Sequence, residues 1–245
     1  MTPAAPSDGS GPPLRADAAR NRARILAAAR AAFRERGTAA PLDEIARRAG
    51  VNIATLYRRF PDGEALIRQV VIDGYTVLLR AAQAAVRETP DGALPAIERW
   101  LLGLVAEREM LVLPLIGGPV VNDAEALAIQ RELGGLLDEL LATARDQGAI
   151  RPDVTAADLT TTVALACRPL PHLDAATGQV LAERHVRVFL DGLRPGPDPS
   201  SPLPPGPTLD EVLARVYAAG PTPTPTPTQT PTPTPTPTPD SKTQR

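Results

Sequence analysis

The chain has 245 residues, of which 43% are hydrophobic and only 3% aromatic, so its core must use Ala, Leu and Val, a composition that favours helices over strands. The single Cys167 excludes an internal disulfide, and without a secretory leader or an apolar run of about 18 residues we expect a cytoplasmic chain with no membrane partner. The formal charge of −2 hides a split, because residues 13–60 hold eleven arginines against four acidic residues, a balance of +7, and the rest carries −9.

The basic N-terminal part is typical of a segment that meets a polyanion, the alternative being a set of solvated helix faces. Residues 1–16 are predicted to be a disordered arm. A first helix is predicted at about residues 17–36, because Ile25, Ala29 and Phe33 recur every fourth residue and Gly37 follows as a C-terminal stop.

Two very short helices are predicted next. Pro41 suits a first helical position, and Gly50 ends an apolar stripe that consists of Leu42, Ile45, Ala46 and Ala49. Asn52 can cap the second helix, which must end near Phe60 because Pro61 disfavours helical dihedrals in the residue before it. This is the spacing of a helix-turn-helix, in which the second helix enters the major groove of DNA.

The second short helix needs one face for packing and one for a partner. Ala54, Tyr57 and Phe60 cannot all face outward, so part of this set must hold the helix to its neighbours. Hydrogen-bond donors for phosphate oxygens and base edges remain at Thr55, Arg58 and Arg59.

The same stretch resembles a known family signature. Residues 41–66, PLDEIARRAGVNIATLYRRFPDGEAL, look like the DNA-binding signature of the tetracycline-repressor (TetR) family of bacterial transcriptional regulators, and residues 25–37, ILAAARAAFRERG, resemble the first helix of that family. The two stretches hold 39 of the 245 residues. It implies an all-α fold, with an N-terminal three-helix DNA-binding domain over residues 17–65 and a larger C-terminal helical domain over 66–194 for ligand binding and dimerisation.

The resemblance also implies specific contacts to operator DNA. Thr55, Tyr57 and Arg58 match family positions that touch the backbone or bases, and Arg47 and Asn52 match secondary contacts. One position departs from the family pattern, because Gly63 stands where a phosphate-binding lysine is common. That leaves this contact to Arg59 or to the arginines of the first helix.

Five helices are predicted for the larger domain, at about residues 62–88, 94–109, 123–147, 155–166 and 176–192. The fourth begins with a capping box at Thr155 and Asp158. Residues 110–121, MLVLPLIGGPVV, are apolar but irregular, and either pack in the core or roof a cavity. By the resemblance, the last two helices pair with those of a second subunit and set two recognition helices about 34–36 Å apart.

Ligand contacts are predicted from scattered residues of the larger domain. The candidates are Tyr75, Trp100, Met110, Cys167 and His172. Trp100 and Met110 are alternatively core residues, Cys167 is alternatively a small buried hydrophobe, and His172 is alternatively a loop residue. His185 is expected in the interface, and no His or Cys spacing indicates a metal site or another cofactor.

The C-terminal part changes composition abruptly. Residues 195–207 are a Pro-rich linker, and residues 208–220 are a short amphipathic helix that should dock on the body or on the partner subunit. Residues 221–245 are a Pro-Thr repeat, read as a disordered tail or, alternatively, as a recognition segment.

The predicted function is that of a ligand-responsive transcriptional regulator, most often a repressor in this family, which binds operator DNA as a homodimer and is released by a small-molecule effector. The alternative is a helical interaction or small-molecule-carrier module without DNA binding, which Gly63 favours. An enzyme is the main rival from another class, and the sequence disfavours it. Serines occur only at positions 7, 10, 200, 201 and 241, in the flexible ends, and no Gly-rich phosphate loop is present.

Overall fold

The structure is a computed structural model that describes residues 12–87, 92–111, 124–170, 172–196 and 202–218. Over these ranges the chain forms α-helices, short 3-10 helices and turns but no strand, so the predicted all-α fold class is confirmed. The Pro-Thr tail lies outside the described residues, as do parts of the predicted arm, of the linker and of the stretch 110–121.

The N-terminal helices form a head with its own core. Its elements are α1 (Pro12–Arg36), η1 (Gly37–Ala39), α2 (Leu42–Ala49) and α3 (Ile53–Arg59). Ile25 and Phe33 of α1, Ile45 of α2 and Leu56 of α3 are buried together, so the four-residue spacing predicted for the first helix faces this core. The helix begins at Pro12 rather than at about residue 17, because proline is well accommodated in a first helical turn.

The turn between α2 and α3 requires the glycine found there. Gly50 ends α2 in the left-handed region with φ of 62°, where a side chain is strained. Its carbonyl accepts a hydrogen bond from the Arg24 guanidinium of α1 at 2.9 Å, and a Cβ atom at Gly50 would collide with that group. Arg24 therefore fixes the turn that aims α3.

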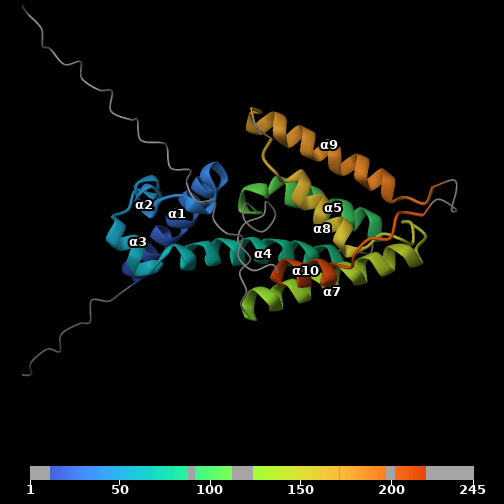
Figure 1. The fold of residues 1–245 in the computed structure, drawn as a ribbon, viewed down its shortest axis with the longest axis horizontal. Helices are drawn as coiled ribbons and strands as arrows, with labels where there is room; N and C mark the ends of the chain where they lie inside the picture. Colours follow the sequence, from blue (N-terminus) through green and yellow to red (C-terminus); the bar gives the residue numbers. More distant parts are fainter. Residues whose placement is uncertain (1–11, 88–91, 112–123, 171, 197–201, 219–245) are drawn as a thin grey trace, which may run out of the picture.

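A long helix, α4 (Gly63–Arg87), runs from the head into the body, which contains the remaining helices (Figure 1). Their bounds are α5 (Ala93–Ala106), η3 (Arg108–Leu111), α7 (Ala124–Asp146), α8 (Ala156–Ala166), α9 (Ala175–Leu193) and α10 (Leu209–Ala218). Tyr75 of α4 packs against both the head core and the body core. The predicted helix 94–109 ends early, because the Met110 N–H bonds the Glu107 carbonyl in a 3-10 turn.

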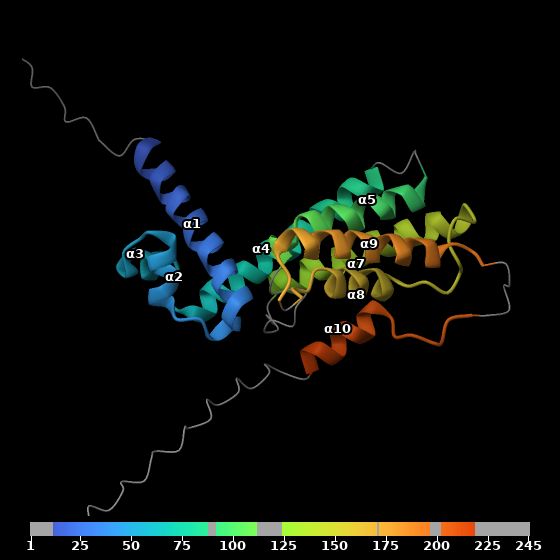
Figure 2. The same ribbon diagram turned by 90° about the horizontal axis from the view of Figure 1, so that it is seen from above.

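Side-chain hydrogen bonds cap the N-termini of α8 and α10. The Asp158 carboxylate accepts the N–H of Thr155 at 2.8 Å. At the start of α10, Thr208 and Glu211 bond each other's backbone N–H groups at 2.9 and 3.2 Å. Figure 2 shows α10 on the opposite side of the body from α5, where Leu209 packs on the body core. The short C-terminal helix therefore docks on the body of its own chain.

Candidate nucleic-acid interface

Helix α3 has one face in the head core and one in solvent. Leu56 is fully buried and Phe60 is 4% exposed, while Tyr57 is 48% exposed. The Arg22 guanidinium lies 5.9 Å from the centre of the Phe60 ring, within cation–π range. Of the two aromatic residues, Phe60 holds the helix to its neighbours and Tyr57 is presented outward.

The N-terminus of α3 is fixed by Asn52. Its side-chain oxygen accepts the backbone N–H of Ala54 at 2.8 Å, which satisfies one of the amide groups left unpaired at a helix start. Both Asn52 and the small Ala54 are exposed, so the leading end of the helix is open to a close approach. The Asn52 side-chain nitrogen is the part left to contact a partner.

Two polar side chains of α3 are linked on its outer face. Arg58 donates a hydrogen bond to the hydroxyl of Thr55 at 3.0 Å, one helical turn away. Arg59 is exposed beside them, and Arg47 is exposed on α2. Within the described part of the chain, the guanidinium groups of Arg47 and Arg59 have no ion pair or hydrogen bond.

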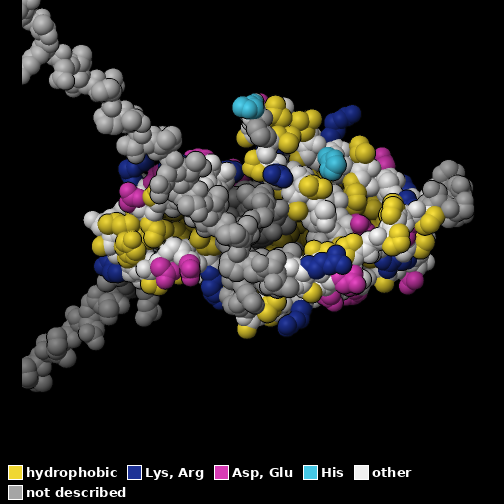
Figure 3. Space-filling model, viewed as in Figure 1, with side chains coloured by type: hydrophobic (Ala, Val, Ile, Leu, Met, Phe, Trp, Pro, Cys, Tyr) yellow, Lys and Arg dark blue, Asp and Glu magenta, His cyan; other side chains and the backbone are white. Residues whose placement is uncertain are grey.

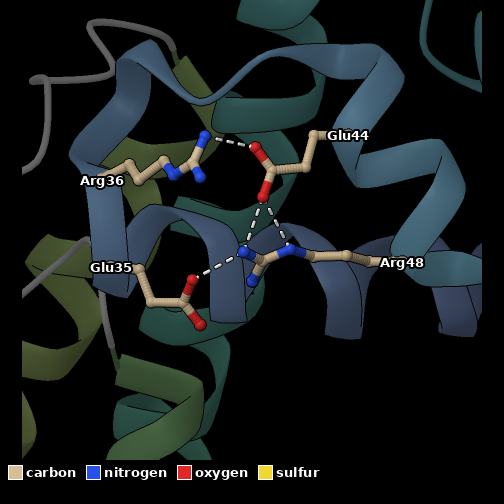
Figure 4. A network of polar contacts seen from close by, with 4 residues as sticks. All are labelled: Glu35, Arg36, Glu44 and Arg48. Carbon is tan, nitrogen blue, oxygen red and sulfur yellow. Dashed lines mark hydrogen bonds and ion pairs between the residues drawn. The ribbon is translucent and has the colours of Figure 1, made fainter.

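Other arginines of the head are used internally, and Figure 4 shows the largest such group. Glu44, with a side chain only 10% exposed, accepts Arg36 at 2.5 Å and Arg48 at 2.6 Å, and Arg48 also donates to Glu35 at 2.7 Å. Hydrogen bonds to Glu35 and then Glu44 raise the pKa of Arg48, and the hydrogen bond from Arg48 lowers the pKa of Glu35. This cluster ties α1 to α2 and leaves its cations occupied.

Further arginines of α1 face the body. Arg30 lies 3.9 Å from Asp73 of α4, and burial lowers the pKa of Arg30. Arg34 pairs with Glu109 of η3 at 3.3 Å. The formal balance of +7 in the sequence thus overstates the cationic surface of the folded head. Several of the counted arginines pair with acidic residues on other helices, and the sequence alone does not show which helices pack together.

The start of α4 keeps its cap but lacks a cation. The Asp62 carboxylate accepts the N–H of Ala65 at 2.8 Å, and Gly63 is the first residue of the helix. A phosphate contact from a side chain at position 63 is therefore impossible.

The predicted ligand residues are not brought together. Trp100 is 2% exposed in the body core, with its indole N–H donating to the Leu78 carbonyl at 3.4 Å. Tyr75 lies between the two cores, Met110 is half-buried on η3, and His172 is exposed with φ of 68°. Cys167 lines a cavity of about 610 Å³ beside the α8–α9 connection, and the other four do not line this cavity.

That cavity is also lined by residues that the sequence did not indicate as ligand contacts, and Arg34 and His185 are two examples. Arg34 reaches it from α1, and His185 reaches it from α9. The sequence indicates neither as a cavity residue, and His185 is expected in the interface instead, because both are brought to the cavity by packing between helices far apart in the chain. Among the described residues, no group of three His, Cys, Asp or Glu side chains could hold a metal ion. No helix within the described ranges is both long enough and apolar enough to span a bilayer.

Comparisons with known proteins cover both the head and the body. The family model described as bacterial regulatory proteins of the tetR family matches residues 25–70, and that of the C-terminal domain of SbtR-like transcriptional regulators matches residues 89–195. A TetR transcription regulatory protein from Mycobacterium vanbaalenii is 33% identical, and the alignment covers 75% of this chain and 100% of that one with a TM-score of 0.51. No curated protein sequence matches the chain.

More distant structures share the fold. The ketosteroid transcriptional regulator KstR2 of Mycobacterium tuberculosis is 18% identical over 71% of this chain and 95% of its own, with a TM-score of 0.55. The TetR family regulator PfmR from Thermus thermophilus is 19% identical over 70% of this chain and 100% of its own, with a TM-score of 0.52.

Proposed function

Because the chain belongs to the tetR family of bacterial regulatory proteins and is a DNA-binding regulator rather than an enzyme, we propose that it is a ligand-responsive repressor. In this proposal it binds operator DNA as a homodimer through the helix-turn-helix of α2 and α3, and a small-molecule effector releases it.

The observation that carries the proposal is the outer face of α3. Arg58 and Thr55 are linked there, Tyr57 is presented to solvent, and Arg47 and Arg59 are free of partners within the described residues. Guanidinium groups bind phosphate oxygens and guanine edges, and a hydroxyl binds either. The proposed DNA contacts are Arg47, Asn52, Thr55, Tyr57, Arg58 and Arg59.

An exposed apolar face on the last two body helices supports the homodimer. Val188 is 67% exposed and Leu165 and Val180 are each 60% exposed, and hydrophobic side chains reach the surface over α8 and α9 in Figure 3. Contiguous apolar surface on a soluble protein marks an interaction site. A two-fold axis through this face would pair α8 and α9 with the same helices of a second chain.

Release by an effector requires two arrangements of the heads. An effector shifts the population toward the released form only by its differential affinity for the two forms. Helix α4 is continuous between the head core and the body core, so it is the element that would transmit the shift.

The test is the salt dependence of operator binding. The purified chain is titrated onto labelled DNA that flanks its own gene, with fluorescence anisotropy at several salt concentrations. If Arg47, Arg58 and Arg59 of two heads contact phosphates, the affinity should fall about a thousandfold between about 50 and 200 mM salt. Binding that does not respond to salt would overturn the interface, and absence of binding would favour the carrier module that position 63 suggests.

A further inference from the structure

The cavity of about 610 Å³ is bordered by both the head and the body. Its lining includes Arg34 of α1, Arg108 and Glu109 of η3, residues 168–170 and 173–174 of the α8–α9 connection and the first turns of α9. Its volume is in the range of small-molecule sites, about 300–1,000 Å³. An occupant would touch the DNA-binding head and the effector-binding body at once.

One part of this cavity is apolar. Leu165, Ala166, Leu181 and Ala182 of α8 and α9 line it, together with Cys167. Burial raises the pKa of the Cys167 thiol to about 12, and the thiol donates to the Leu104 carbonyl at 3.8 Å. The thiol is therefore neutral and turned into the body, so it adds no charge to the lining.

The charged part of the lining has more donors than acceptors. The lining includes three arginines, Arg34, Arg108 and Arg168, and two acidic residues, Glu109 and Asp174. Asp174 is already used as a helix cap, because its carboxylate accepts the N–H and the hydroxyl of Thr177 at 2.9 and 2.7 Å.

The remaining carboxylate, that of Glu109, is 75% exposed where it pairs with Arg34. Arg108 donates to the Ala175 carbonyl at 2.6 Å, which uses one of its five N–H groups. Arg168 is exposed and has no ion pair or hydrogen bond within the described part of the chain. Guanidinium donors are thus left over beside an apolar wall.

We propose that this cavity binds an amphipathic organic anion, a carboxylate with an apolar chain, through Arg168 and Arg34 at its charged side and Leu181 and Leu165 at its apolar side. The carboxylate replaces Glu109 as the partner of Arg34 and so changes the contact between α1 and η3. The effect of this change on DNA binding rests on the proposed repressor function, whereas binding of the anion does not.

Binding is tested with sodium decanoate on the full chain by isothermal titration calorimetry, and 1-decanol is the uncharged probe of equal chain length. Decanoate should bind at saturable stoichiometry and at least tenfold more tightly than decanol. Arg168→Gln and Arg34→Gln should each weaken decanoate about tenfold or more, since each removes a charge-assisted hydrogen bond. Neither change should alter the affinity for decanol.

Arg131→Gln is the matched control, because Arg131 is exposed on α7 and does not line the cavity. It should bind decanoate like the wild type. Thermal melts of all three variants establish that they are folded. Equal affinity for decanoate and decanol, no binding of decanoate, or unchanged binding by Arg168→Gln overturns the proposal.

The effect on DNA separates this site from the repressor function. Decanoate should release the wild-type chain from its flanking DNA, and Arg168→Gln should need about tenfold more decanoate for the same release. A chain that binds decanoate but no DNA would retain the anion site and lose the repressor proposal. A chain that binds both without mutual effect would overturn the exchange at Arg34, because coupling between sites is reciprocal.

Discussion

Arg58 and Thr55 illustrate how a contact surface is prepared by single residues. The hydrogen bond between them restrains the Arg58 side chain before any partner arrives, so less conformational entropy is lost when it binds. Asn52 is committed to capping α3 through its oxygen, and a substitution there would act on the helix as well as on a contact. A substitution of Arg58 therefore tests recognition alone, whereas a substitution of Asn52 changes both helix stability and recognition.

Tyr57→Ala and Arg58→Ala should each weaken operator binding, by about 1–3 kcal/mol for a base or phosphate contact. Both side chains are exposed, so the melting temperature and the oligomeric state should stay those of the wild type. Arg80→Ala is the control, because Arg80 is an exposed arginine in the middle of α4. Anisotropy titrations measure the affinities, and unchanged affinity in both variants would disprove the assigned contacts.

Glu44 is the acidic residue on which the joint between α1 and α2 depends. Glu44→Gln leaves Arg36 and Arg48 facing a neutral group in a poorly solvated position, which should destabilise the fold by about 1–3 kcal/mol. Glu35→Gln is the comparison, because Glu35 is 52% exposed and should cause a smaller loss. Urea unfolding curves give both values, and equal losses would contradict the special position of Glu44.

Helix α10 is an element that the family match does not include, since that match ends at residue 195. Two contacts place it. The N–H of Leu203 donates to the Asp153 carboxylate at 2.6 Å. Leu209 lies against Gly134 of α7, where an added Cβ atom would be 3.5 Å from the Leu209 Cδ2 atom. The residues before α10 are thus tied to the body by one backbone hydrogen bond, and the helix itself by apolar contact.

Asp153→Asn should release residues 203–218 from the body. The hydrogen bond from Arg151 and then that from Leu203 lower the pKa of Asp153 from 3.8 to about 2. A lowered folded-state pKa means that this contribution is complete at neutral pH and is lost as the pH falls from about 4 to about 2. At neutral pH, hydrogen exchange should accelerate at residues 203–218 in the variant and stay unchanged in α5. Unchanged protection at residues 203–218 would show that apolar contact alone holds α10.

Helix positions could be predicted from sequence because their signals are local. Gly37 and Gly50 adopt positive φ where stops are predicted, and Asn52 caps α3 where a start is predicted. Pairing across helices could not be predicted in this way. Whether Arg48 faces Glu35 or a ligand depends on how α1 and α2 pack, and the cavity at Cys167 depends on contacts among α1, η3, α8 and α9.

At the scale of the whole molecule, the described chain has an apolar face that it does not cover itself. Val180 and Val188 of α9 are both exposed and do not line the cavity, although their neighbours Val186 and Leu190 are buried. Helix α9 therefore has two apolar sides. One serves the body core, and the other is the proposed interface.

Val188→Asp should convert the proposed dimer into a monomer, because a desolvated carboxylate without a partner is costly in an apolar interface. Sedimentation velocity measures the change, and operator affinity should fall with it, since two heads no longer act together. Ala128→Asp on the exposed side of α7 is the control and should keep the wild-type mass. A dimer that tolerates Val188→Asp would place the interface elsewhere.

The continuity of α4 has a geometric consequence. Its 25 residues form a rigid rod of about 37 Å, rooted in the body at one end and in the head at the other. A tilt of about 5° at the rooted end displaces the far end by about 3 Å over that length. This is close to the spacing of successive base pairs, about 3.4 Å, so a rotation too small to disturb packing in the body would suffice to put a head out of register with its half-site.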